Sequence, residues 1–175
     1  MPGGGGAPLI TVGMSAAVAV PRARVWAALA DAEEVVHWRP GLLAAPAGAE
    51  RYPKPGETVR WPCRVWELPL ELRETPVEVV AGERLHTRLQ LGLFRFEATF
   101  TLAPLASQPP RTRVGLQVQV ANEIPLVGGT LDRFGVRRLA TELAATQLMA
   151  LRDWCEAARP HERTPGPTLL AAAAR

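Results

Sequence analysis

The sequence is short of lysine, cysteine, serine and aromatic residues, and these shortages exclude several classes of protein. Lys54 is the only lysine, and the arginines that supply the other basic charges are scattered, so the net charge of +3 does not predict a nucleic-acid surface. Cys63 and Cys155 lie far apart, with no CxxC motif and no histidine at metal-ligand spacing. We therefore expect two buried, apolar cysteines rather than a disulfide or a zinc site.

Motifs of the large enzyme classes are missing as well. Ser15 and Ser107, the only serines, have no GxSxG around them, and neither GxGxxG nor HExxH occurs. The segment GGTLDRFG, residues 128–135, lacks the lysine and hydroxyl that a phosphate-binding loop needs. The sequence thus predicts no cofactor and no metal. General acid–base chemistry stays open, because one buried arginine or glutamate with a shifted pKa would be enough for it.

Long apolar runs are also absent. No run approaches the ~20 residues that span a bilayer, and the N-terminus lacks a charged segment followed by an apolar one. We expect a cytoplasmic protein without stable membrane insertion. Its 175 residues suit one domain with a sizeable core. Residues 1–8 are expected to form a flexible lead-in, 9–158 the domain, and 159–175 a disordered tail rich in proline and alanine.

Alternating, strand-like patterns dominate the domain. The first runs from Ile10 to Val20, after which Pro21 starts a short helix and Glu33–Trp38 form a second one. Further segments of this kind follow with only short turns or loops between them: Thr58–Trp66, Leu70–Val80, Arg84–Leu91, Phe94–Leu102 and Val114–Val120. Their order predicts an antiparallel sheet. The apolar parity changes within the second of them, and a bulge near Glu74–Pro76 would reconcile it.

A long amphipathic helix closes the domain. Thr130 is its expected N-cap, and residues 131–158 contain no proline and a single glycine, Gly135. At about 100° per residue, the apolar residues gather on one side and most of the charged ones on the other. The predicted fold class is therefore α+β: an antiparallel sheet wrapped around one long C-terminal helix, with two short helices after the first strand.

Two stretches of this sequence resemble a known superfamily. VAVPRARVWAALADAEEVVHWRPG, at Val18–Gly41, is similar to the opening of START-like proteins, the SRPBCC group. IPLVGGTLDRFGVRRLATELAATQLMALRDW, at Ile124–Trp154, resembles the closing helix of its polyketide cyclase/dehydrase-like branch. The resemblance implies a helix-grip fold, in which a curved sheet of about seven strands grips the last helix around an apolar cavity. The seventh strand would have to lie in Leu42–Tyr52.

The candidate site residues follow from this arrangement. The expected apolar lining consists of Trp61, Phe94, Phe96, Phe100, Leu116, Val118, Leu139 and Leu143. The alternative is that these side chains simply pack together. Gln147 falls on the apolar side of the helix, where it would either orient a ligand or bond to the backbone or to trapped water. Either Arg73 or Glu74 points inward, depending on the bulge, and Thr87 is a further polar candidate.

These observations favour the binding or transport of a hydrophobic small molecule, such as a lipid, a polyketide or an aromatic metabolite. One alternative is a polyketide cyclase/dehydratase-type enzyme, in which Arg73, Glu74 or Gln147 polarises a substrate in the same cavity. Another is a protein with a filled core that acts through its surface. The fold alone does not choose among the three, and the sequence leaves the oligomeric state open.

Overall fold

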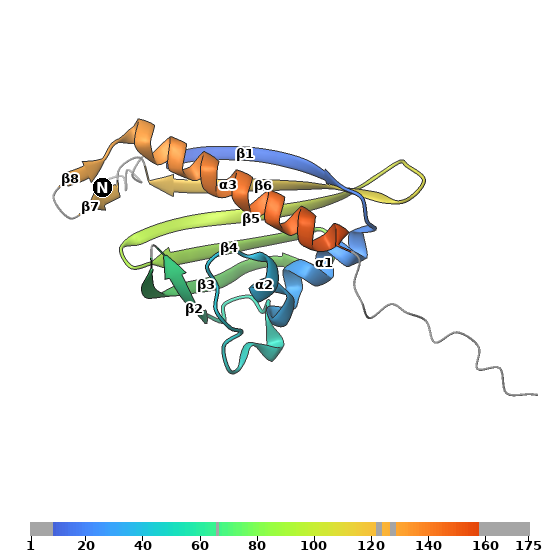
Figure 1. The fold of residues 1–175 in the computed structure, drawn as a ribbon, viewed down its shortest axis with the longest axis horizontal. Helices are drawn as coiled ribbons and strands as arrows, with labels where there is room; N and C mark the ends of the chain where they lie inside the picture. Colours follow the sequence, from blue (N-terminus) through green and yellow to red (C-terminus); the bar gives the residue numbers. More distant parts are fainter. Residues whose placement is uncertain (1–8, 66, 122–123, 127–128, 158–175) are drawn as a thin grey trace, which may run out of the picture.

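The fold consists of a curved sheet and a long helix laid across its inner face (Figure 1). A computed structural model describes residues 9–65, 67–121, 124–126 and 129–157. Within these residues, the main sheet is antiparallel throughout, in the order β1-β6-β5-β4-β3-β2. Its strands are β1 (Leu9–Val18), β2 (Val59–Val65), β3 (Leu68–Val80), β4 (Arg84–Leu91), β5 (Phe94–Leu105) and β6 (Arg111–Ala121). The predicted helix-grip architecture is confirmed.

The expected seventh strand does not form in residues 42–52. Leu42 makes one isolated bridge to Cys63, and a short 3-10 helix occupies Ala49–Arg51. Pro46 and Gly48 explain the difference, because proline cannot donate to a ladder and Gly48 has a left-handed φ of 85°. The described residues instead contain two further short strands, β7 (Ile124–Leu126) and β8 (Gly129–Leu131), which pair only with each other.

The predicted irregularity in β3 is present, slightly later than expected. The register with β4 shifts between Pro76 and Glu78, so that Val77 is the extra residue. The bulge changes which parity faces inward, because Glu74 is buried before it and Val79 packs against the core after it. It therefore decides that Glu74, rather than Arg73, lies on the inner face.

Three helices complete the domain: α1 (Arg22–Ala30), α2 (Ala32–Trp38) and α3 (Arg133–Glu156). The Asp132 carboxylate caps α3 by accepting a hydrogen bond from the Gly135 amide at 2.9 Å. The prediction that Thr130 caps this helix is wrong, because Thr130 belongs to β8. None of the described helices is both long and apolar enough to cross a membrane.

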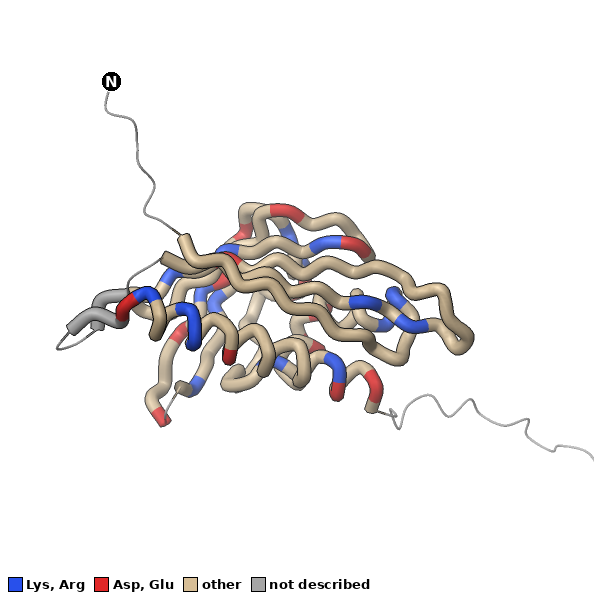
Figure 2. The backbone as a smooth tube through the Cα atoms, turned by 90° about the horizontal axis from the view of Figure 1, so that it is seen from above, with Lys and Arg blue, Asp and Glu red and all other residues tan. Residues whose placement is uncertain are grey.

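The core lies between α3 and one side of the sheet. Val136, Ala140, Ala144, Leu148, Leu151 and Cys155 form the buried face of α3. This face packs mainly on β1 and β6, while α1 and α2 lie beside the C-terminal half of α3. Viewed from above, the sheet and α3 form separate layers, and acidic and basic positions are interspersed over both (Figure 2). Cys63 and Cys155 are both buried, as predicted.

Gly41→Ala is expected to lower the free energy of unfolding by about 1–3 kcal/mol, because Gly41 has a φ of +84° that other residues adopt only with strain. A Cβ there would also lie 2.9 Å from the carbonyl oxygen of Arg64, which faces Gly41 across a backbone hydrogen bond. Gly56→Ala is the matched control, since Gly56 has a φ of +81° and open space around it. Equal losses in urea denaturation would contradict the steric contribution.

Candidate ligand-binding site

Three polar side chains meet inside the domain at one end of the inner face. The Arg39 guanidinium donates to both carboxylate oxygens of Glu74, with Nη1–Oε2 and Nη2–Oε1 distances of 2.6 and 3.5 Å. The Tyr52 hydroxyl donates to Oε1 of Glu74 at 3.2 Å. Arg39 is 4%, Tyr52 7% and Glu74 0% exposed. We call Arg39, Tyr52 and Glu74 the buried ionic cluster.

Local structure brings the cluster together from three separate segments. Arg39 is the C-cap of α2, and Tyr52 follows the 3-10 helix in the loop before β2. Glu74 lies on β3, opposite Val59 on β2 and Leu89 on β4. The loop between α2 and β2 thus folds over the inner face and covers a carboxylate that would otherwise lack a counter-charge.

Within the buried ionic cluster, the pKa values of Arg39 and Tyr52 are both raised. Burial by itself would lower the pKa of the Arg39 guanidinium, but the attraction of the Glu74 carboxylate outweighs it and raises that pKa. Burial raises the pKa of the Tyr52 phenol, and the Glu74 carboxylate raises it further. Arg39 therefore stays cationic and Tyr52 stays a neutral hydroxyl donor throughout the physiological pH range.

Aromatic rings surround the cluster. Trp61 meets the Tyr52 ring edge-on, with the ring centroids 5.3 Å apart, and Trp38 meets Phe100 in the same way at 6.2 Å. The Trp38 indole donates to the Ala28 carbonyl at 2.7 Å. The Trp61 indole nitrogen is buried and makes no hydrogen bond with the described residues, and the same holds for Nε of Arg39. Two donors at this end of the fold thus lack a partner within the described residues.

One flank of α3 faces α2. Trp154 identifies this flank, because its indole donates to the Glu34 carboxylate at 2.9 Å and its ring stacks on His37 at 5.0 Å. Leu143 and Gln147 precede Trp154 by three and two helical turns and lie on the same flank. Gln147 is half-buried and has no hydrogen-bond partner among the described residues.

The predicted site residues fall into three groups by burial. The buried group is Trp61, Glu74, Thr87, Phe100, Leu116 and Val118. Phe94, Phe96, Leu143 and Gln147 are half-buried. Leu139 is 45% exposed. Arg73 lies on the outer face of the sheet, where its guanidinium donates to Glu71 at 2.9 Å. The buried and half-buried residues therefore lie on the inner face of the sheet or on the helix that covers it, whereas Arg73 lies on the outer face.

Sequence reasoning missed Arg39 and Tyr52 as partners of Glu74. Both lie in irregular or terminal segments, where no periodicity assigns a side chain to the interior. The available signal was indirect: a glutamate at an inward position requires a cation or several donors. Arg39, directly before Pro40-Gly41 at a helix end, was one of many arginines that could supply the charge.

Comparison with known proteins extends these observations. The sequence profile of the family described as "Polyketide cyclase / dehydrase and lipid transport" matches residues 10–156. A search of curated proteins finds no match to the chain. Similar solved structures include a START superfamily protein from Mycobacterium smegmatis, with 19% identity over 83% of this chain and 97% of that one, and a TM-score of 0.65.

Two more solved structures share the fold. The Zhui aromatase/cyclase from Streptomyces sp. R1128 has 16% identity and a TM-score of 0.62, covering 85% of this chain and 94% of that one. A protein from Nitrosomonas europaea has 17% identity and a TM-score of 0.60, covering 83% and 94%. At these identities, the likeness concerns the fold alone.

Proposed function

Because the chain belongs to the family of polyketide cyclases/dehydrases and lipid-transport proteins, we propose that it binds an apolar small molecule between α3 and the inner face of β3–β5. The observation that carries the proposal is the set of apolar side chains left half-buried there, next to Gln147, whose amide has no hydrogen-bond partner among the described residues. A lipid, a polyketide or an aromatic metabolite has the required chemistry. The preferred compartment is the cytoplasm, as the sequence leads us to expect.

Apolar surface on both walls supports this site. On the sheet, Leu91, Phe94 and Phe96 are half-buried at the β4–β5 turn, although their parity directs them inward. On the helix, Leu139 and Leu143 are partly exposed on the flank defined by Trp154. Covering such surface with an apolar ligand is favourable by about 25 cal/mol per Å² removed from water.

Polar groups would set the orientation of the ligand. Gln147 lies among apolar neighbours on α3, where its amide can both donate to and accept from a ligand carbonyl or hydroxyl. The buried ionic cluster fixes the loop between α2 and β2 against β3, because Arg39 and Tyr52 both bond to Glu74. A site with one rigid wall loses less conformational entropy on binding than a flexible one.

A cyclase/dehydratase-type activity is the second candidate, and the cluster is the observation that favours it. The Tyr52 hydroxyl keeps its proton because burial and Glu74 raise its pKa. A neutral phenol of this kind can donate a hydrogen bond to a carbonyl that becomes an enolate. This activity requires a substrate to reach Tyr52, and Tyr52→Phe would then abolish turnover while leaving ligand binding intact.

Leu143→Trp is expected to weaken binding of Nile red, a neutral apolar dye, at least tenfold, because the larger ring would occupy the position proposed for the ligand beside Gln147. Met149→Trp is the matched control, since it places the same ring on an exposed position of α3. Fluorescence titration measures both variants. A wild-type protein that fails to brighten the dye would overturn the proposal in favour of a filled, surface-acting domain, and so would equal binding by both variants.

Native mass spectrometry identifies the natural ligand class. We expect protein purified from its own host to carry an apolar compound in stoichiometric amount, recoverable by organic extraction. Incubation of that compound with the empty protein then separates the two candidate functions, because a carrier returns it unchanged and a cyclase or dehydratase converts it.

A further inference from the structure

The outer face of the sheet, opposite α3, contains a hollow of about 670 Å³. Most of its lining residues have outward parity, and they come from all six strands of the main sheet and from Thr58, just before β2. The polar ones include Arg60, Arg73, Arg88, Arg95, Gln90, Gln119 and the carboxylate of Glu97. Leu89, Phe96 and Val120, whose side chains have inward parity, also line it. Trp61 and Leu72, which are next in sequence to Arg60 and Arg73, are buried on the inner face. The polar side of the hollow therefore lies on the face opposite the apolar site proposed above, and Phe96 borders both.

The strand register gathers four arginines here from distant parts of the sequence. Arg60 on β2 lies directly opposite Arg73 on β3, which lies opposite Gln90 on β4. Gln90 in turn lies opposite Arg95 on β5. Arg88 occupies the neighbouring row, opposite Thr75. Like charges placed directly across a strand pair are destabilising, so the Arg60–Arg73 pair needs a counter-charge nearby.

The carboxylates near the hollow neutralise the arginines only in part. Glu71 serves two of them, accepting from Arg73 at 2.9 Å and lying 3.8 Å from Arg60. Glu97 accepts from Arg88 at 3.2 Å and also bonds to His86 at 2.9 Å. Arg95 makes no ion pair with any described residue. Three guanidinium groups thus share two carboxylates, and the fourth, that of Arg95, pairs with none among the described residues.

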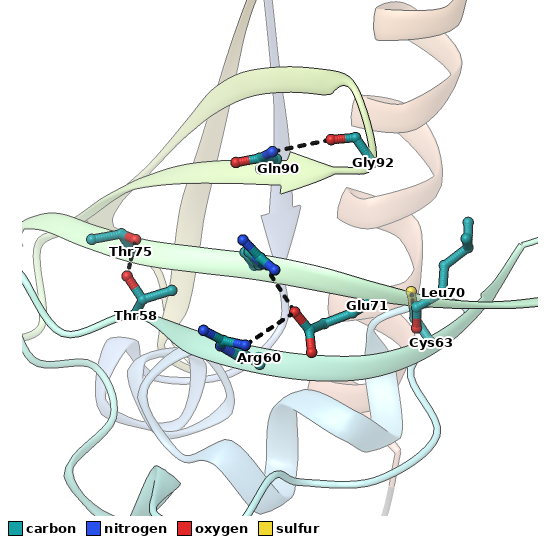
Figure 3. Close-up of polar contacts among 9 residues, drawn as sticks. Thr58, Arg60, Cys63, Leu70, Glu71, Thr75, Gln90 and Gly92 are labelled. Atoms are coloured by element: carbon teal, nitrogen blue, oxygen red, sulfur yellow. Dashed lines mark hydrogen bonds and ion pairs between the residues drawn. The ribbon is translucent and has the colours of Figure 1, made fainter.

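Neutral hydrogen-bonding groups complete the surface. The hydroxyls of Thr58 and Thr75 bond to each other at 2.7 Å, and the Gln90 amide donates to the Gly92 carbonyl at 3.1 Å (Figure 3). Figure 3 shows these groups with Arg60 and Glu71 along neighbouring strands. Each hydroxyl and the second N–H of Gln90 can still turn toward a ligand.

We propose that this hollow binds a small molecule that carries phosphate or carboxylate groups. Guanidinium forks match the paired oxygens of both anions, which is why arginine rather than lysine suits such a site. The volume lies within the range of about 300–1,000 Å³ that is usual for small-molecule sites. A bound oxyanion supplies a counter-charge to Arg95 and adds a second one to Arg60 and Arg73, which share the single carboxylate of Glu71.

Arg73→Gln/Arg95→Gln tests the site against Arg111→Gln/Arg113→Gln. The control removes the same two charges from β6 on the same outer face, outside the hollow. Isothermal titration with pyrophosphate and with citrate, at matched ionic strength, is expected to show one saturable site on the wild type. The first variant should bind at least tenfold more weakly, and the control within about twofold of the wild type.

Each result has a defined meaning. Tighter binding of pyrophosphate assigns a phosphorylated ligand, and tighter binding of citrate assigns a polycarboxylate. Absence of saturable binding with both probes overturns the proposal, and so does equal weakening in the two double variants, which would indicate general charge attraction. Circular dichroism checks that the variants keep their fold, which we expect because all four substituted positions are exposed. Nile red binding stays unchanged in these variants if the two sites are separate.

Discussion

Arg39→Met is expected to lower the free energy of unfolding by about 3–5 kcal/mol, because it leaves the Glu74 carboxylate buried without its counter-charge. Glu74 is 0% exposed, so solvent cannot replace the guanidinium without local opening of the structure. The Tyr52 hydroxyl supplies one remaining hydrogen bond, which does not compensate for a missing charge. Urea denaturation followed by tryptophan fluorescence measures the loss.

Glu74→Leu combined with Arg39→Met separates the cost of an unpaired charge from the net contribution of the pair. We expect the double variant to recover most of the stability lost in Arg39→Met, since apolar replacement of a whole buried pair is often neutral or better. Arg138→Met is the control, because Arg138 forms an exposed pair with Glu142 on α3, and its removal should change little. A double variant as unstable as Arg39→Met would show that packing, rather than charge, dominates at this position.

Raising the pH above 10 is expected to destabilise the protein by about 1.4 kcal/mol for each pH unit, through Tyr52 alone. The folded-state pKa of Tyr52 lies above the ordinary value of 10.0, because burial and the Glu74 carboxylate disfavour the phenolate. Above pH 10, the unfolded chain therefore loses a proton that the folded chain retains. This contribution to stability is fully present below that pH and is lost as the pH rises toward the folded-state pKa.

Composition makes this titration easy to isolate. Tyr52 is the only tyrosine, so the ultraviolet absorbance of phenolate reports the titration of Tyr52 without interference from other tyrosines. We expect phenolate to appear with unfolding rather than before it. Tyr52→Phe is the reference, because it keeps the ring against Trp61 and lacks the titrating group. If the wild type and this variant lose stability with the same slope above pH 10, the burial argument for Tyr52 fails.

The two outcomes also bear on the proposed functions. A cluster that depends on the charge of Glu74 and on a protonated Tyr52 holds the loop between α2 and β2 in place. Ligand binding by Arg39→Met should then weaken together with its stability. In Tyr52→Phe, which retains the Arg39–Glu74 pair, binding should persist.

Local pattern was enough to predict most of the architecture. Alternation of apolar and polar residues placed the strands from Phe94 to Val120, because each of these strands has one buried face and its parity is unbroken. The long run without proline predicted α3 to within two residues at either end. Prediction failed where alternation stops, as in residues 42–52, and where two cap residues compete, as at Thr130 and Asp132.

What the sequence by itself determined is the fold class, the inner and outer faces of the regular strands, and the resemblance to a START-like family. Only the tertiary structure decided that Glu74 points inward, since the bulge at Val77 sets its parity and Arg39 reaches it from 35 residues away. The arginine hollow likewise depends on the register of four strands. The physical reason is that periodicity reports on one element at a time, whereas counter-charges and cross-strand neighbours arise from contacts between elements that are distant in the chain.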